Sequence, residues 1–287
     1  MDSVEYVLAA IEQIERLAYY SDRIDWPAVH KRASATIAAD AAPELTYREI
    51  RSILVSLQDG HSFLVPPHEG PQMATTVWGR VEVRRDSAQV GYIRLDGFFG
   101  GDRGEIDDFA RILSDRIDAL ANDDVRGWIV DLRQNRGGNM WPMLGGLASI
   151  IGTRDLGQFV YRNGMREPWN VDESVALPLF RTSQLTAPVA VMIGEVTASS
   201  GEAVAIAFMG RHKSRLFGEP TRGLSSSNET IRLIDGARLM LTTSLFADRA
   251  GKVHSGSIWP DERVADEHAI FEAARNWITS RLQDIEQ

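Results

Sequence analysis

An apolar strand followed directly by an apolar helix is the feature that most constrains the fold of this chain. The strand candidate is Pro188 to Ile193, a short run of the length expected for a buried strand. The helix candidate, Ser200 to Met209, is apolar at every position from Ala203 onward. Strand–turn–helix units recur from residue 76 onward, and they imply an α/β core whose site lies at the carboxyl ends of the strands.

The part of the chain before this core has helical periodicity. One helix is predicted from Val4 to Leu17, a second after the N-cap Asp25, and a third from a capping box at Thr46. A linker rich in proline and glycine follows at 66–71. We therefore expect a small N-terminal helical subdomain over 1–72 and an α/β core over 73–287. In the core, the pattern predicts strands at 76–84, 89–95, 125–132, 188–193, 214–217, 229–233 and 239–244, and helices at 105–120, 140–151, 200–209 and 266–282.

Composition excludes several classes of function. The net charge of −9 disfavours nucleic-acid and anionic-membrane partners. The chain has no cysteine, so thiol catalysis, disulfides and thiolate metal sites are excluded. No two histidines have metal-ligand spacing, and we expect neither a metal nor a cofactor. The acidic start of the chain and the lack of a long apolar run predict a cytoplasmic protein without a signal peptide, with a mature chain trimmed of its leader as the alternative.

Several loops carry residue types that acyl chemistry requires. Ser199 lies at the start of the apolar helix, where free N–H groups and the helix dipole favour an oxyanion. The alternative is that Thr197 or Ser199 merely caps this helix. A turn with Gly137 and Gly138 follows the strand at 125–132 and can aim backbone N–H groups at a substrate. His61, which follows the third helix, is either a proton acceptor or a helix cap.

Taken in order, these segments resemble the tail-specific and C-terminal processing serine protease superfamily, which includes the tricorn core protease. The motifs are Asp131-Leu-Arg with its double glycine, Thr197-Ala-Ser-Ser-Gly-Glu202, Gly218-Glu-Pro-Thr221 and Pro260-Asp261. The resemblance covers roughly residues 45 to 265. It implies a crotonase-like (ClpP/crotonase) catalytic core. Many members insert a PDZ domain before this core, but here the segment between His61 and Thr76 is too short to hold one.

The resemblance also implies catalytic roles. Ser199 would be the nucleophile and His61 the general base, as in the tricorn-like branch, because the position of the lysine used in the other branch holds Leu224. The oxyanion hole would combine the backbone N–H of Ser200 with that of Gly138, or of Gly137.

The orienting third residue is where the match departs from the family. The slot of the family's glutamate holds His254. Three accounts stay open: His254 shares the proton transfer, Asp248 or Glu262 replaces the acid after a loop shift, or the triad is incomplete. Glu202 is a second candidate, with the alternative that it is an acid favourable to the start of the helix.

The expected function is that of a cofactor-independent serine peptidase acting on a peptide or protein. Its cleft would be lined by Asn139, Trp141, Thr221 and Leu224. Homo-oligomers are common in the superfamily, which makes self-association a candidate. Two alternatives stay open: a non-catalytic protein that binds a retinoid or fatty acid, similar to the interphotoreceptor retinoid-binding proteins, and an esterase or peptide cyclase that uses the same serine.

Overall fold

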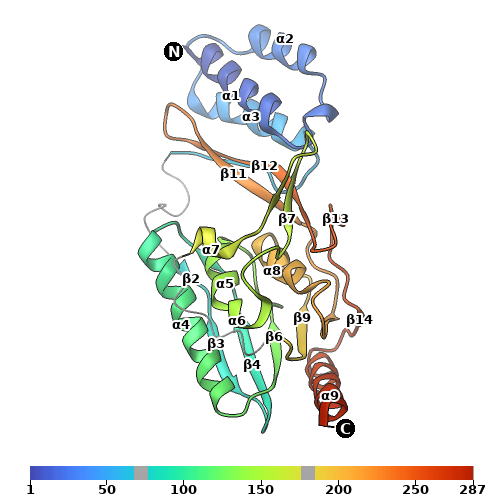
Figure 1. The fold of residues 1–287 in the computed structure, drawn as a ribbon. Helices are drawn as coiled ribbons and strands as arrows, with labels where there is room; N and C mark the ends of the chain where they lie inside the picture. The colour runs from blue at the N-terminus through green and yellow to red at the C-terminus, as the bar shows by residue number, and fades with distance from the viewer. Residues whose placement is uncertain (68–76, 176–184, 287) are drawn as a thin grey trace. The chain divides into compact units, whose positions relative to one another are not determined.

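The computed structural model describes residues 1–67, 77–175 and 185–286, which belong to two compact units (Figure 1). Unit 1 comprises Met1–Pro71, Val160–Met165 and Ser226–Leu245. Unit 2 comprises Gln72–Phe159, Arg166–Ser225 and Phe246–Gln287. The expected subdomain boundary at 72/73 and most of the linker at 66–71 lie outside the described residues.

Three helices form the first part of unit 1: α1 (Ser3–Leu17), α2 (Trp26–Thr36) and α3 (Pro43–Ser56), with a 3-10 turn at Ser21–Arg23. The side chain of Asp25 caps α2 as predicted, by accepting the N–H of Ala28. The capping box predicted at Thr46 is wrong. Helix α3 already begins at Pro43, whose fixed φ suits the first turn, and the Thr46 hydroxyl donates to the Pro43 carbonyl.

Unit 1 also contains strands that come from distant parts of the chain. Strand β12 (Arg238–Ala247) pairs antiparallel with β1 (Phe63–Val65) and with β11 (Ser226–Arg232). A β-bulge interrupts the β11 register between Ser227 and Asn228. The helices and strands share one core, built from Val7, Ile11, Ile14, Val29, Ile50, Ile53, Leu64, Leu239 and Leu241.

Unit 2 is built around a six-stranded sheet in the order β14-β10-β9-β6-β4-β3. All its neighbouring strands are parallel except the β3–β4 pair. Its strands are β3 (Val81–Arg85), β4 (Val90–Leu95), β6 (Gly127–Asp131), β9 (Val189–Ile193), β10 (Ser214–Gly218) and β14 (Glu262–Arg263). The other short strands are β2 (Val77–Trp78), β5 (Phe98–Phe99), β7 (Gln158–Tyr161), β8 (Arg166–Pro168) and β13 (Val253–His254). Strand β7 is divided between the units, since its last two residues belong to unit 1.

Helices cover both faces of this sheet, which confirms the predicted α/β class (Figure 1). Helix α9 (Glu267–Glu286) packs on one face against Ile129 and Met192. The alternate residues Val130 and Val191 join the other core, with α4 (Arg103–Asn122), α5 (Met140–Gly146) and α8 (Ser200–Phe208). The helix predicted at 140–151 breaks at Leu147 into α5 and α6 (Ala148–Ile151), and a short α7 (Val171–Ser174) follows.

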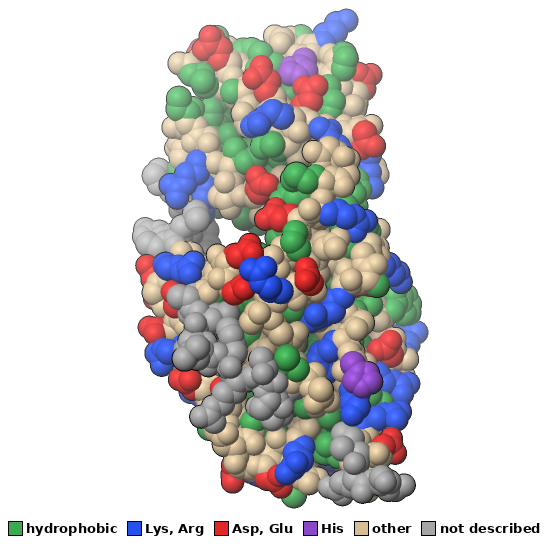
Figure 2. Space-filling model, viewed as in Figure 1, with side chains coloured by type: hydrophobic (Ala, Val, Ile, Leu, Met, Phe, Trp, Pro, Cys, Tyr) green, Lys and Arg blue, Asp and Glu red, His purple; other side chains and the backbone are tan. Residues whose placement is uncertain are grey.

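The parallel strands place the turns that follow β4, β6, β9 and β10 at one edge of the sheet. In α/β sheets this edge is where ligands bind. None of the helices in the described ranges is both long and apolar enough to cross a bilayer. Acidic and basic side chains are interspersed over the face of the molecule shown in Figure 2.

Candidate active site

Ser199 lies in a strained turn between β9 and α8. Its backbone has φ 53° and ψ −120°, a region that costs a residue with a side chain about 1–3 kcal/mol. Thr197 does not cap α8: its hydroxyl donates to the Leu132 carbonyl (2.8 Å) and accepts the N–H of Gly194 (3.1 Å). Such strain persists only where the surroundings hold it, and it concentrates at functional sites.

Glu202 is the group that holds the strained turn. Its carboxylate is fully buried. One oxygen accepts the N–H groups of Ser199 and Leu224, both at 2.8 Å. The other accepts the N–H of Gly223 (2.9 Å) and the hydroxyl of Thr221. Burial raises the pKa of Glu202 above its ordinary value, and these four hydrogen bonds offset only part of that rise. Glu202 thus joins the serine turn to the turn at 221–224.

The double-glycine turn lies directly against the serine. Gly137 and Gly138 have φ of 98° and 103°, which only glycine adopts readily. A Cβ on Gly137 would lie 2.9 Å from the Cβ of Ser199, and one on Gly138 would lie 2.0 Å from the Phe98 carbonyl oxygen. The turn therefore needs glycine at 137 to approach the serine and glycine at 138 to pack against Phe98.

Two backbone N–H groups next to Ser199 have no acceptor in the described parts of the chain, those of Gly138 and Ser200. The Gly137 carbonyl accepts the N–H of Phe98 (3.3 Å), so the planar trans peptide turns the Gly138 N–H away from Phe98. The Gly138 carbonyl is held by the Ser200 hydroxyl (2.6 Å). The N–H of Gly137, by contrast, is already bonded to Asn135.

Asn135 organises both turns, and the sequence reasoning missed it. The side chain is fully buried; its Oδ1 accepts the N–H of Gly137 and its backbone carbonyl accepts the N–H of Ala198, each at 2.9 Å. Its amide Nδ2 donates to the Met143 sulfur (3.3 Å). An asparagine two residues before a glycine is a common turn signal, and that signal could have identified it.

His61 belongs to unit 1, where its ring and backbone are both fixed. Helix α3 ends at Ser56, so His61 does not cap it. The ring Nδ1 lies 2.8 Å from the Ser226 hydroxyl, and the backbone N–H donates to Asp59 (2.9 Å). Burial lowers the pKa of His61 and the nearby Asp59 charge partly offsets this, so the imidazole is neutral at pH 7.

The candidates for an orienting acid in unit 2 each have another partner. The Nε2 of His254 lies 3.1 Å from the carboxylate of Asp248. The second oxygen of Asp248 accepts the N–H groups of Ala250 and Lys252. Glu262 forms an ion pair with Arg215 at 3.3 Å. Asp248 and His254 are therefore hydrogen-bonded to each other within the hairpin that joins β12 to β13.

The predicted cleft residues of the glycine turn also have structural contacts. The Asn139 side chain caps α5 by accepting the N–H of Trp141 (3.0 Å), and the backbone N–H of Asn139 donates to the Phe98 carbonyl (2.6 Å). The Trp141 ring is half-buried and packs edge-on to Phe159, with ring centroids 6.3 Å apart. Thr221 and Leu224 lie in the turn that Glu202 binds.

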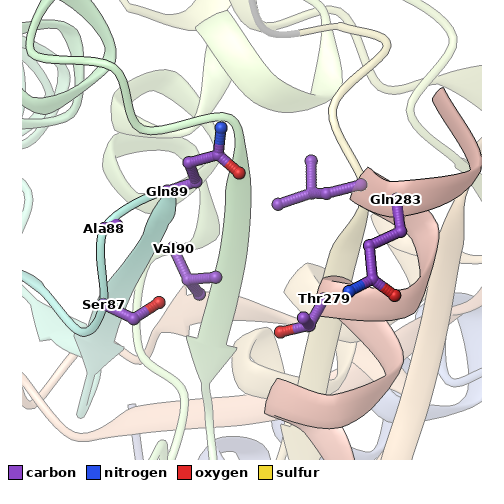
Figure 3. A pocket seen from close by; sticks show the side chains of 7 residues that line it. Ser87, Ala88, Gln89, Val90, Thr279 and Gln283 are labelled. Carbon is purple, nitrogen blue, oxygen red and sulfur yellow. The ribbon is translucent and has the colours of Figure 1, made fainter. Parts of the chain in front are cut away.

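A cavity of about 300 Å³ lies elsewhere in unit 2, between the β3–β4 turn and α9 (Figure 3). It includes Val90, the first residue of β4, and therefore lies at the amino end of that strand. Its lining is Ser87, Ala88, Gln89, Val90, Thr279, Leu282 and Gln283. The serine turn lies at the carboxyl edge, so this cavity is not the candidate site. Among the described residues, no group of three or more acidic or histidine side chains could hold a metal ion.

Comparison with known proteins agrees with the chemistry of these turns. The family model described as Peptidase family S41 matches residues 89–264. A nisin-resistance protein of Lactococcus lactis subsp. lactis is 24% identical over 97% of this chain and 88% of its own length. A chloroplastic carboxyl-terminal-processing peptidase of Arabidopsis thaliana is 29% identical over 56% of this chain and 29% of its own.

The fold also matches a solved structure, that of a lipoprotein from Streptococcus agalactiae. The TM-score is 0.82 at 24% identity, covering 98% of this chain and 97% of that one. This likeness and the nisin-resistance relative contradict the predicted cytoplasmic location. That prediction depended on composition and on apolar runs, whereas a lipoprotein is held at a membrane by an attached lipid, which composition does not record.

Proposed function

The chain belongs to peptidase family S41 and is a serine-type peptidase with a peptide or protein substrate, and from this premise we propose that Ser199 is its nucleophile and His61 its general base. The observation that carries the proposal is the strained Ser199 backbone beside the N–H groups of Gly138 and Ser200, which have no acceptor among the described residues. Ser199 is also the N-cap residue of α8, and a helix start alone accounts for the free N–H of Ser200, but it accounts neither for the strained Ser199 backbone nor for the N–H of Gly138. The Ser–His design also accounts for Leu224, which cannot serve as the lysine base of other members.

The proposed reaction is hydrolysis through an acyl-enzyme. The neutral His61 imidazole accepts the Ser199 hydroxyl proton as the Ser199 oxygen attacks the peptide carbonyl. The Gly138 and Ser200 N–H groups bind the resulting oxyanion, and each such donor contributes about 3 kcal/mol to transition-state stabilisation. The imidazolium then protonates the leaving amine, and a water molecule hydrolyses the ester by the same route.

We assign Glu202 to holding the turns rather than to orienting the imidazole. All four of its hydrogen bonds go to the serine turn and the 221–224 turn, which uses both carboxylate oxygens. His254 is hydrogen-bonded to Asp248 within its own hairpin, and we give it no proton-transfer role. We further propose that unit 2 is a crotonase-like core and that the helices of 1–72 are the main part of a second subdomain, which also includes β11 and most of β12.

The relatives suggest where the protein acts and on what. Because one relative is a nisin-resistance protein and one solved structure is a lipoprotein, we propose action outside the cytoplasm on a peptide antibiotic of the nisin kind. Because another relative is a carboxyl-terminal-processing peptidase, we also propose that the cleavage occurs near a free C-terminus of the substrate.

Incubation of the purified protein with nisin, followed by mass spectrometry, tests this proposal. We expect a product shortened at its C-terminal end with the wild type, and none with Ser199→Ala or His61→Ala. A panel of unmodified C-terminal peptides separates a general tail-specific activity from one restricted to the antibiotic. Turnover that persists in Ser199→Ala would contradict the assignment of the nucleophile. Tight retinoid or fatty-acid binding without any turnover would instead favour a binding protein.

A further inference from the structure

We infer that Ser226 is the positioning residue of His61, with its hydroxyl accepting the Nδ1–H so that Nε2 carries the reactive lone pair. The inference deepens the proposed function, in which His61 is the base. The contact is 2.8 Å long and joins residues far apart in the chain, both within unit 1. Ser226 is buried as the first residue of β11, so the ring contacts an ordered group.

The surroundings of His61 form a hydrogen-bonded cradle that serves this one residue. Its backbone N–H donates to the Asp59 carboxylate (2.9 Å), and its carbonyl accepts the Asn228 amide (2.8 Å). The second oxygen of Asp59 accepts the Ser62 hydroxyl (2.6 Å), which in turn accepts the N–H of Thr242 (3.0 Å). The Thr242 hydroxyl donates to the Asn228 side chain (2.8 Å). The backbone of His61 is thus fixed on both sides, and Ser226 supplies the remaining constraint, on the ring.

The direction of the Ser226 hydrogen bond decides whether His61 can act as a base. A neutral imidazole has one N–H and one lone pair. If Ser226 accepts from Nδ1–H, the lone pair is on Nε2; if the hydroxyl donates, Nε2 carries the proton and cannot accept another. The first arrangement is the one that a serine nucleophile requires.

A hydroxyl orients the ring without supplying charge, which distinguishes this arrangement from an acid-based triad. Asp59 is the charged group near the ring, and its oxygens are bonded to the backbone N–H groups of His61 and Ser62 and to the Ser62 hydroxyl. Ser226 therefore provides the contact that the family's glutamate would otherwise make, which explains how the slot at His254 can lack an acid.

Nitrogen-15 NMR of histidine-labelled protein tests the inference without any reference to activity. The His61 signals are assigned by their loss in His61→Asn. We expect the Nδ1–H tautomer in the wild type and a shift toward the Nε2–H tautomer in Ser226→Ala, with Ser226→Thr resembling the wild type. An Nε2–H tautomer in the wild type would overturn the inference, even if Ser226→Ala failed to fold.

Steady-state kinetics supply the second readout, with Ser227→Ala as the matched control on the same strand. Loss of the tautomer preference should lower kcat at least about tenfold with KM nearly unchanged, because full enforcement of the wrong tautomer costs about four orders of magnitude in a serine protease. Ser226→Thr should restore kcat and Ser227→Ala should leave it intact. Equal losses in Ser226→Ala and Ser227→Ala would overturn the inference. Full activity in His61→Ala would refute the proposal that His61 is the general base. It would leave intact the NMR evidence that Ser226 sets the tautomer of the His61 ring.

Discussion

Replacing Ser199 by glycine should give a more stable protein than replacing it by alanine. Both changes remove the hydroxyl, so their difference isolates the backbone. At φ 53° and ψ −120° a side chain costs about 1–3 kcal/mol, which glycine avoids. Glycine loses about 0.4–1 kcal/mol more than alanine through the greater freedom of its unfolded chain. The free energy of unfolding of Ser199→Gly should therefore exceed that of Ser199→Ala by about 1 kcal/mol.

Urea denaturation followed by tryptophan fluorescence measures this difference, and equal slopes in the two variants would show that the unfolded states are comparable. Neither variant should hydrolyse peptides, so the glycine variant would gain stability at the expense of activity. At an unstrained position the glycine variant would instead be less stable than the alanine variant, by about 0.4–1 kcal/mol. If Ser199→Gly proved less stable than Ser199→Ala, the reasoning that the site stores backbone strain would be refuted.

Further consequences concern the groups around the serine and the proposed base. Glu202→Gln places an amide donor against at least one backbone N–H donor, that of Gly223, so it should lower the free energy of unfolding by about 1–3 kcal/mol in urea titrations, whereas the exposed Glu195→Gln should not change it. Gly138→Ala puts a Cβ 2.0 Å from the Phe98 carbonyl, so kcat should fall by about 10²–10³ in a peptidase assay; unchanged kcat would exclude this N–H from the oxyanion hole. Burial lowers the pKa of His61, which keeps the base neutral to lower pH, so the acid limb of kcat/KM should lie below 6.5; a midpoint above 6.5 would contradict the assignment.

Local patterns predicted the elements that carry the site. The apolar run before the serine turn is β9, and the apolar segment after it is α8, because a strand buried on both faces and a helix inside a core admit few polar residues. Gly137 and Gly138 could be singled out because a turn with positive φ needs glycine. The strained φ and ψ of Ser199 could not be predicted from the sequence, because serine is not a residue that signals such a conformation.

Long-range contacts account for most of what the sequence did not reveal. Strands β11 and β12 were predicted as strands, but nothing local showed that Ser226–Leu245 packs in unit 1 with the helices. The contact between Ser226 and His61 joins residues with no shared motif. The sequence makes Glu202 a candidate for the orienting acid, but its bonds to the 221–224 turn depend on a contact between two loops that no local pattern indicates.

The central claim is that Ser199 is a nucleophile activated by His61, and labelling with a fluorophosphonate serine probe tests it most directly. Peptide mapping of the labelled protein should find the adduct on Ser199, with labelling reduced to background in His61→Ala and absent in Ser199→Ala. An adduct on another serine, or undiminished labelling of Ser199 in His61→Ala, would contradict the account.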